Sequence, residues 1–173
     1  MKAQADDFPA APPDAVDLAA QLIAELEGFS PKAYADPPGQ TNLHSIGYGH
    51  QIRTGDGFNT DSQISEPDAL DLLHQDLNST VKTVNKAVTV DLSPQQLAAL
   101  YSFAYNVGPG HFQTSTLLKR VNAGDFAGAQ EQFAVWNIAN GHVNAGLVSR
   151  REKEASLFGS ATGTTGPDET ADA

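Results

Sequence analysis

Apolar residues near the start of the chain recur at helical spacing. The positions are Val16, Ala19, Ala20, Ile23 and Leu26. This stripe predicts a helix with Asp14 as its N-cap and Glu27 as its last residue, because Gly28 stands where a C-terminal cap belongs. Residues 33–52 are rich in Gly, Pro and Tyr, which favours a short hairpin region with its connection at residues 37–39.

Two further helix starts carry capping signals. Ser65 is followed by Pro67 and Asp68, and Ser93 is followed by Pro94 and Gln96. The expected buried stripe of the first of these helices is Leu70, Leu73, Leu77, Val81, Val84 and Val88. The helix after Ser93 is apolar nearly all round, so we expect it to be central and buried.

The rest of the chain reads as helical stretches near residues 116–121, 127–136 and 147–158, separated by turns that contain Gly. The predicted fold class is α+β and mainly α, with a small β lobe near the start. We expect one domain over residues 18–158, with flexible acidic tails at 1–17 and 159–173, because both ends are too polar to pack.

The chain carries a net charge of -11, and each tail contributes -3 of it. Nucleic acid and anionic membrane surfaces are poor partners for such a protein. The absence of Cys excludes disulfides and thiol chemistry. The apolar stretch 18–26 is interrupted by Gln21 and Glu25, so it predicts neither a signal peptide nor a membrane span. We therefore expect synthesis in the cytoplasm.

The candidate chemistry is a pair of carboxyl groups on separate elements. Glu27 ends a helix beside an apolar stripe, and both features favour the protonated form that a general acid needs. Asp36 precedes Pro37, which favours extended backbone and a polar setting in which the carboxylate stays ionised. Taken singly, either residue equally fits an ordinary role, as a surface Glu at a helix end or an Asp that starts a turn.

Ser45 and the histidines complete the set of polar candidates. The Ser45 hydroxyl could share a water with Asp36, or could only bond backbone across the hairpin. His44 and His50 flank the glycines of one strand, but no His-Glu-x-x-His motif occurs and the other histidines are scattered. The pattern therefore favours no metal site, and no cofactor is expected.

Six segments together resemble one known family. They are Glu27-Gly28-Phe29, Ala33 to Asp36, Ser45 to His50, Asn106 to Gly110, Ser115 to Leu118, and Gly146 to Arg151. In this order they are similar to the phage lysozymes, glycoside hydrolase family 24, over residues 18–158. The resemblance implies two lobes joined by a long helix, with a cleft for the β-1,4 bond between N-acetylmuramic acid and N-acetylglucosamine in peptidoglycan.

The resemblance also implies roles. Glu27 matches the general acid, Asp36 the group that positions the attacking water, and Ser45 the third catalytic residue, with inversion at the anomeric carbon. His50 and Asp76 match a stabilising ion pair, and Arg150 lies near a position whose Arg approaches the catalytic Glu.

Two departures concern the third residue. Ser45 stands where the family usually carries Thr, and residues 37–44 form a longer connection than is common in the family. Serine lacks the methyl group that restricts χ1, so its hydroxyl is less pre-organised.

The favoured hypothesis is a monomeric muramidase of phage origin, acting on the bacterial cell wall as an endolysin or from within the virion. Its acidic surface slightly favours the virion, with other virion proteins as partners. One alternative is a glycan-binding or virion structural module with a lysozyme fold and no activity. Another is an enzyme for chitin or a different amino-sugar polymer, which only a comparison of substrates separates.

Overall fold

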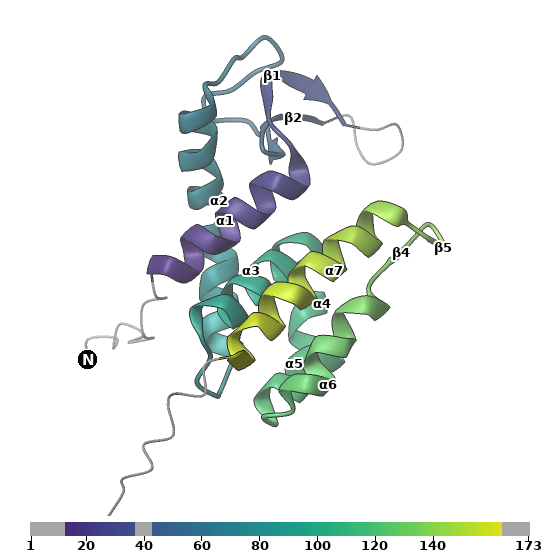
Figure 1. The fold of residues 1–173 in the computed structure, drawn as a ribbon. Coiled ribbons are helices and arrows are strands. Elements are labelled where there is room, and N and C mark those ends of the chain that lie inside the picture. Colours follow the sequence, from purple (N-terminus) through teal and green to yellow (C-terminus); the bar gives the residue numbers. More distant parts are fainter. Residues whose placement is uncertain (1–12, 37–42, 164–173) are drawn as a thin grey trace, which may run out of the picture.

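A computed structural model describes residues 13–36 and 43–163 of the chain, and these residues form two lobes (Figure 1). The smaller lobe contains β1 (Ser30–Ala35), β2 (His44–Gly47), β3 (His50–Gln51) and the first part of α2 (Glu66–Ala87). The larger lobe contains α3 (Pro94–Val107), α4 (Pro109–Thr114), α5 (Thr116–Asn122), α6 (Phe126–Gln132) and α7 (Ala145–Gly159). Helix α1 (Pro13–Glu27) lies between the lobes.

Helices α1 and α2 contribute to the cores of both lobes. In α1, Ala15 and Ala19 pack in the larger core, whereas Ala20 and Ile23 pack in the smaller one. In α2, Ala69, Leu73 and Leu77 belong to the smaller core and Val84 to the larger. The long helix predicted to join the lobes is therefore α2, and α1 runs beside the junction (Figure 1).

The small lobe is built on a three-stranded antiparallel sheet in the order β1-β2-β3. Tyr34 pairs with Ser45, and Ala35 pairs with His44. The pairing continues past β1, because the Asp36 amide donates to the Leu43 carbonyl at 3.0 Å. The hairpin that the sequence predicts is thus present, while its expected connection at Pro37, Pro38 and Gly39 lies outside the described residues.

The two predicted helix caps form as expected. The Ser65 hydroxyl accepts from the Asp68 amide, and Ser93 forms a complete capping box with Gln96. Helix α3 is buried on most sides and packs against α1, α2 and α7, which confirms its predicted central place. Along α2 the stripe is narrower than predicted: Leu70 and Val81 are only partly buried, and Val88 lies beyond the helix.

The helices extend a few residues beyond residues 18–158 at each end. Helix α1 begins at Pro13, so Asp14 lies inside the first turn rather than at the cap, and Ala15 is fully buried. Proline is favoured at the first helical position, which accounts for the earlier start. At the other end, α7 continues to Gly159 and is followed by the 3-10 helix η2 (Ser160–Gly163). Residues 1–12 and 164–173 lie outside the described residues.

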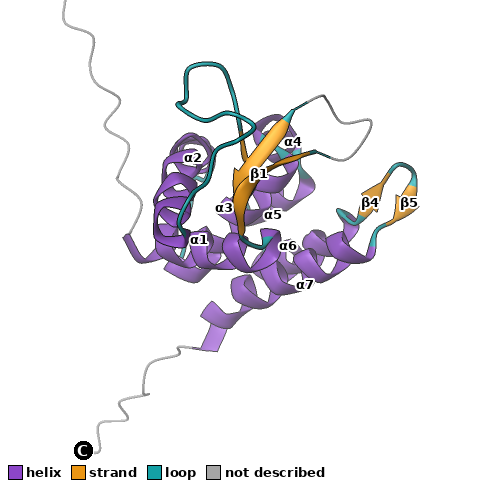
Figure 2. Cartoon of the chain, turned by 90° about the horizontal axis from the view of Figure 1, so that it is seen from above, coloured by secondary structure: helices purple, strands orange, loops and turns teal. Residues whose placement is uncertain are grey.

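Two short elements were not predicted, and one helix is shorter than predicted. Helix α4 occupies the stretch after Gly108. The expected helix at 127–136 ends at Gln132 and continues as the 3-10 turn η1 (Phe133–Val135). A small hairpin of β4 (Ile138–Ala139) and β5 (His142–Val143) then projects beyond the start of α7 (Figure 2). Among the described residues, no helix combines the length and apolar character needed to span a membrane.

Candidate active site

Glu27 lies where the chain leaves α1 for the small lobe. Gly28 adopts a φ of +73°, and its amide donates to the Ala24 carbonyl at 3.0 Å, so the helix ends with a left-handed cap. The Arg150 guanidinium, from α7 of the large lobe, donates to Glu27 Oε1 at 2.5 Å. Arg150 is 7% exposed and Glu27 34% exposed. The carboxyl group is thus anchored on one oxygen and still open to solvent.

Asp36 and Ser45 meet across the β1–β2 hairpin. The Ser45 hydroxyl donates to Asp36 Oδ1 at 2.8 Å, and Ser45 is buried. Because Ser45 pairs with Tyr34 and side chains alternate along a strand, Tyr34, Asp36 and Ser45 share one face of the sheet. The longer connection between Asp36 and Ser45 therefore leaves their contact intact.

Tyr34 lies near enough to both carboxyl groups to respond to their charges. Its pKa is raised by burial and then by the nearby charges of Asp36 and Glu27, while a hydrogen bond with Ser45 acts in the opposite direction. A single phenol thus senses all three candidate catalytic residues. Gly49 closes the other side: a Cβ added there would lie 3.8 Å from Glu27 Oε2.

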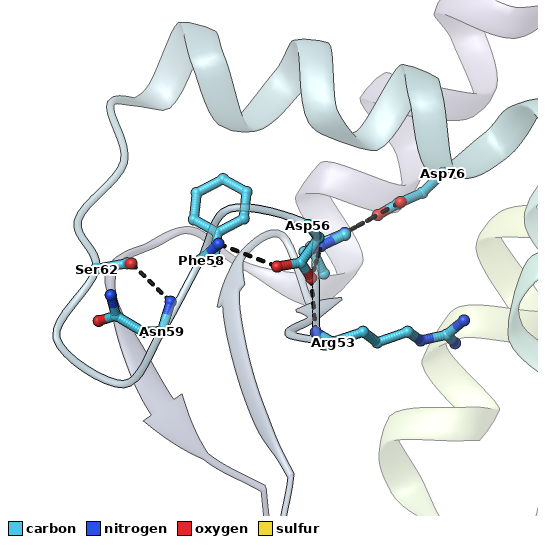
Figure 3. A network of polar contacts seen from close by, with 7 residues as sticks. Arg53, Asp56, Phe58, Asn59, Ser62 and Asp76 are labelled. Carbon is cyan, nitrogen blue, oxygen red and sulfur yellow. Dashed lines mark hydrogen bonds and ion pairs between the residues drawn. The ribbon is translucent and has the colours of Figure 1, made fainter.

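His50 links the sheet to α2 and to the following loop. Its Nδ1 lies 2.8 Å from Asp76 Oδ2, and its Nε2 lies 3.3 Å from Asp56 Oδ2. The predicted contact between His50 and Asp76 is therefore present, and Asp56 is a second carboxylate that the sequence analysis did not assign to it. Asp56 also accepts from the amides of Arg53 and Phe58, at 2.6 and 3.0 Å (Figure 3).

A cavity of about 450 Å³ opens beside this network, and we call it the Arg53 cavity. Its lining includes Gly49, Gln51, Arg53, Gln75, Thr80 and Tyr105. Burial raises the pKa of Tyr105, and the charges of Asp76 and Glu27 raise it further, whereas Arg150 lowers it. The cavity thus begins next to the candidate general acid and extends to Arg53.

The family assignment follows from comparisons with known proteins. The sequence profile described as phage lysozyme matches residues 24–154. The chain belongs to the phage lysozyme family. It is 44% identical over 137 residues to the endolysin of Bacillus phage B103, which covers 79% of this chain and 51% of that relative. It is 40% identical to the SAR-endolysin of bacteriophage PS119, covering 76% of this chain and 75% of that relative.

A solved structure agrees with this assignment. The endolysin from Escherichia coli O157:H7 phage FAHEc1 superposes with a TM-score of 0.73 at 30% identity, covering 86% of this chain and 92% of that one. The chain spans about half the length of the two Bacillus phage endolysins it matches, B103 and PZA.

The six residues singled out from the sequence of this phage lysozyme family member form three contacting pairs: Arg150 donates to Glu27, Ser45 donates to Asp36, and His50 faces Asp76. Arg150, which the family resemblance placed near the catalytic Glu, bonds Glu27 Oε1.

Sequence reasoning missed Tyr34, Tyr105, Arg53 and Asp56. Tyr34 lies within one motif segment and Tyr105 directly precedes another, so their positions in the sequence could have indicated that they lie near the site. Arg53 and Asp56 lie in a loop whose path no motif predicts.

Within residues 13–36 and 43–163, no group of three or more His, Asp or Glu side chains is arranged to hold a metal ion.

Proposed function

We propose that the protein is a muramidase that hydrolyses the β-1,4 bond between N-acetylmuramic acid and N-acetylglucosamine in bacterial peptidoglycan. The observation that supports the proposal is the hydrogen bond from Ser45 to Asp36, together with the carboxyl group of Glu27 that Arg150 holds on one oxygen. Two carboxyl groups in different settings are what acid-assisted cleavage of a glycosidic bond requires. Membership of the phage lysozyme family supports the same substrate class.

The roles follow from the hydrogen bonds. The Ser45 hydroxyl donates a hydrogen bond to Asp36 Oδ1. Asp36 Oδ2 and the lone pairs of the Ser45 oxygen are then left to accept hydrogen bonds from a water. As that water attacks the anomeric carbon, its proton passes to Asp36. Glu27 donates its proton to the departing sugar oxygen as the glycosidic bond breaks. Water enters opposite the leaving group, so the configuration inverts.

Arg150 has a positioning role in this scheme. It bonds Glu27 Oε1 only, while Oε2 is the oxygen nearest to Gly49. The second oxygen is therefore the one available to carry the proton to the substrate. His50 and Asp76 support the strand that follows Ser45 by linking it to α2.

The decisive test is Glu27→Gln, which keeps the shape of the side chain and removes the transferable proton. We expect release of reducing ends from purified peptidoglycan to fall by about 10²- to 10⁴-fold with the fold unchanged. Glu25→Gln is the matched control, because Glu25 lies on the same helix and bonds Lys153 on the surface. Its activity should stay within about twofold of wild type.

Two outcomes would contradict the proposal. A folded Glu27→Gln variant with wild-type rates excludes the acid role. Wild-type protein that sediments with insoluble peptidoglycan but releases no reducing ends supports the binding-module alternative. The configuration of the first-formed product, read by NMR before mutarotation, tests the inverting mechanism, and chitin oligosaccharides test the alternative substrate.

For delivery we propose action on the host cell wall as an endolysin, by a monomeric catalytic domain. The names of the relatives, endolysin and SAR-endolysin, favour this over carriage in the virion. The acidic charge favours the virion, but only weakly, since screening limits long-range capture by the wall. Mass spectrometry of purified phage particles separates the two routes: the protein should be absent from particles and abundant in lysates.

A further inference from the structure

Arg53 places a positive charge in the cavity next to the candidate general acid. Its guanidinium forms no ion pair within the part of the chain that the structure describes. Lys32, Lys82, Lys86 and Lys119 are likewise without an ion pair among the described residues, but Arg53, which is exposed, is the one of these cations in the cavity lining. Figure 3 shows the side chain extending away from the carboxylate of Asp56.

The backbone of Arg53 is held in place by Asp56. The Arg53 amide donates to Asp56 Oδ2, and the Asp56 amide donates back to the Arg53 carbonyl at 3.3 Å. The pKa of Asp56 is lowered, chiefly by the amides of Arg53 and Phe58 and to a smaller extent by His50. Both carboxylate oxygens are therefore engaged by backbone and imidazole, so Asp56 fixes the Arg53 turn without neutralising the guanidinium.

The other carboxylate of the cavity is engaged as well. His50 lies between Asp56 and Asp76, with Nδ1 facing Asp76 and Nε2 facing Asp56. Tyr105 adds a hydroxyl to the lining, and its raised pKa keeps that hydroxyl protonated as a hydrogen-bond donor. The lining thus offers a ligand the Arg53 guanidinium and the Tyr105 phenol, together with the side-chain amides of Gln51 and Gln75 and the hydroxyls of Ser79 and Thr80. The guanidinium suits an anionic acceptor.

We propose that Arg53 binds a carboxylate of the peptidoglycan substrate in the Arg53 cavity, carried by the lactyl group or the peptide stem of a muramic acid residue. This inference rests on the proposed function. The sugar chain must pass Glu27, and the cavity starts at Gly49 beside Glu27 Oε2, so a substituent of a neighbouring sugar can reach it. Arg53 then acts as a specificity-determining residue, with Asp56 as its positioning residue.

The test compares Arg53→Gln with wild type on three forms of soluble, uncross-linked glycan strands. One form is untreated, one has its carboxyl groups converted to amides with carbodiimide and ammonia, and one has its peptides removed by an amidase so that only lactyl carboxylates remain. On untreated strands we expect kcat/KM to fall about three- to tenfold, through KM, with the loss reduced by salt. On amidated strands the variant should match wild type.

Arg53→Lys should keep part of the wild-type rate, because it keeps the charge. Lys119→Gln is the matched control: it removes the same charge from α5, away from the cavity lining, and should change nothing. The lactyl carboxyl is tied up as an amide wherever a peptide is attached, so a loss on untreated strands that disappears on peptide-free strands assigns the stem, and a loss only on peptide-free strands assigns the lactyl carboxylate. An equal loss on amidated strands, or no loss on either of the other two forms, overturns the inference.

A binding measurement separates this inference from the proposed function. If wild type cleaves no strand, the muramidase assignment fails. Titration of a soluble disaccharide-peptide followed by NMR still compares the Kd of wild type and Arg53→Gln. A Kd weaker by about three- to tenfold in the variant supports carboxylate binding, and an unchanged Kd excludes it.

Discussion

At the scale of single residues, the orientation of the Ser45 hydroxyl depends on the hairpin around it. Its hydroxyl is buried and bonded to Asp36, and its strand partner is Tyr34. The burial and the bond restrict the rotamer that a free serine would vary. The tertiary structure thus supplies part of the pre-organisation that a threonine methyl would give.

We therefore predict that Ser45→Thr keeps activity within about twofold of wild type or raises it, whereas Ser45→Ala lowers kcat about 10- to 100-fold, because a misplaced water reacts slowly. Reducing-end release and thermal unfolding of both variants check this. If Ser45→Thr stays folded but loses all activity, the role assigned to Ser45 is wrong.

At the scale of elements, two glycines with left-handed backbone differ in how much space surrounds them. Gly28 and Gly47 both have positive φ, at +73° and +66°. A Cβ at Gly28 would meet nothing within 4 Å, but a Cβ at Gly47 would lie 3.0 Å from the Cβ of Ala69 on α2. The end of β2 thus packs directly on α2, and this contact sets the distance between the strand that carries Ser45 and that helix.

Comparing Gly28→Ala with Gly47→Ala separates the cost of backbone strain from the cost of a packing clash. Gly28→Ala should lower the free energy of unfolding by about 1–2 kcal/mol through the left-handed backbone alone. Gly47→Ala should lower it by about 1–3 kcal/mol more, because β2 or α2 must shift. Urea unfolding of the two variants measures the difference. Equal losses would mean that Ala69 gives way freely.

At the scale of the whole molecule, a buried ion pair within α7 is tied to α3 by a hydrogen bond. Arg151 Nε lies 3.1 Å from Glu154 Oε2, and the Ser102 hydroxyl donates to Glu154 Oε1 at 2.7 Å. Burial raises the pKa of Glu154 to about 7, although Arg151 and Ser102 both oppose the shift. Desolvation of the carboxylate therefore outweighs its attraction to the guanidinium.

The shift makes stability depend on pH. Between about 4.5, the ordinary pKa, and about 7, the folded protein keeps the Glu154 proton while the unfolded chain has lost it, so the free energy of unfolding falls as pH rises. Relative to Glu154→Gln, which carries no such proton, wild type should lose up to about 3 kcal/mol across this window. Denaturant unfolding at pH 4.5, 6 and 8 measures it. A constant difference between the two proteins would contradict the raised pKa.

The sequence alone determined the features that depend on local physics. Helical spacing and the caps at Ser65, Ser93 and Gly28 predicted the start or end of three helices, because capping involves residues close together in the chain. The ordered motifs indicated the family. The hairpin region predicted over residues 33–52 is present, since strand pairing in a hairpin is also nearly local.

Only the tertiary structure decided which distant groups meet. The hydrogen bond of Arg150 to Glu27 joins α7 to the end of α1, and the Arg53 cavity is lined by residues from the β3 region, α2 and α3. The contact of Asp56 with His50 depends on the path of the loop between them. The burial that raises the pKa of Glu154 likewise comes from packing between helices. Desolvation and electrostatic contacts depend on three-dimensional distances, and these distances cannot be read from spacing along the chain.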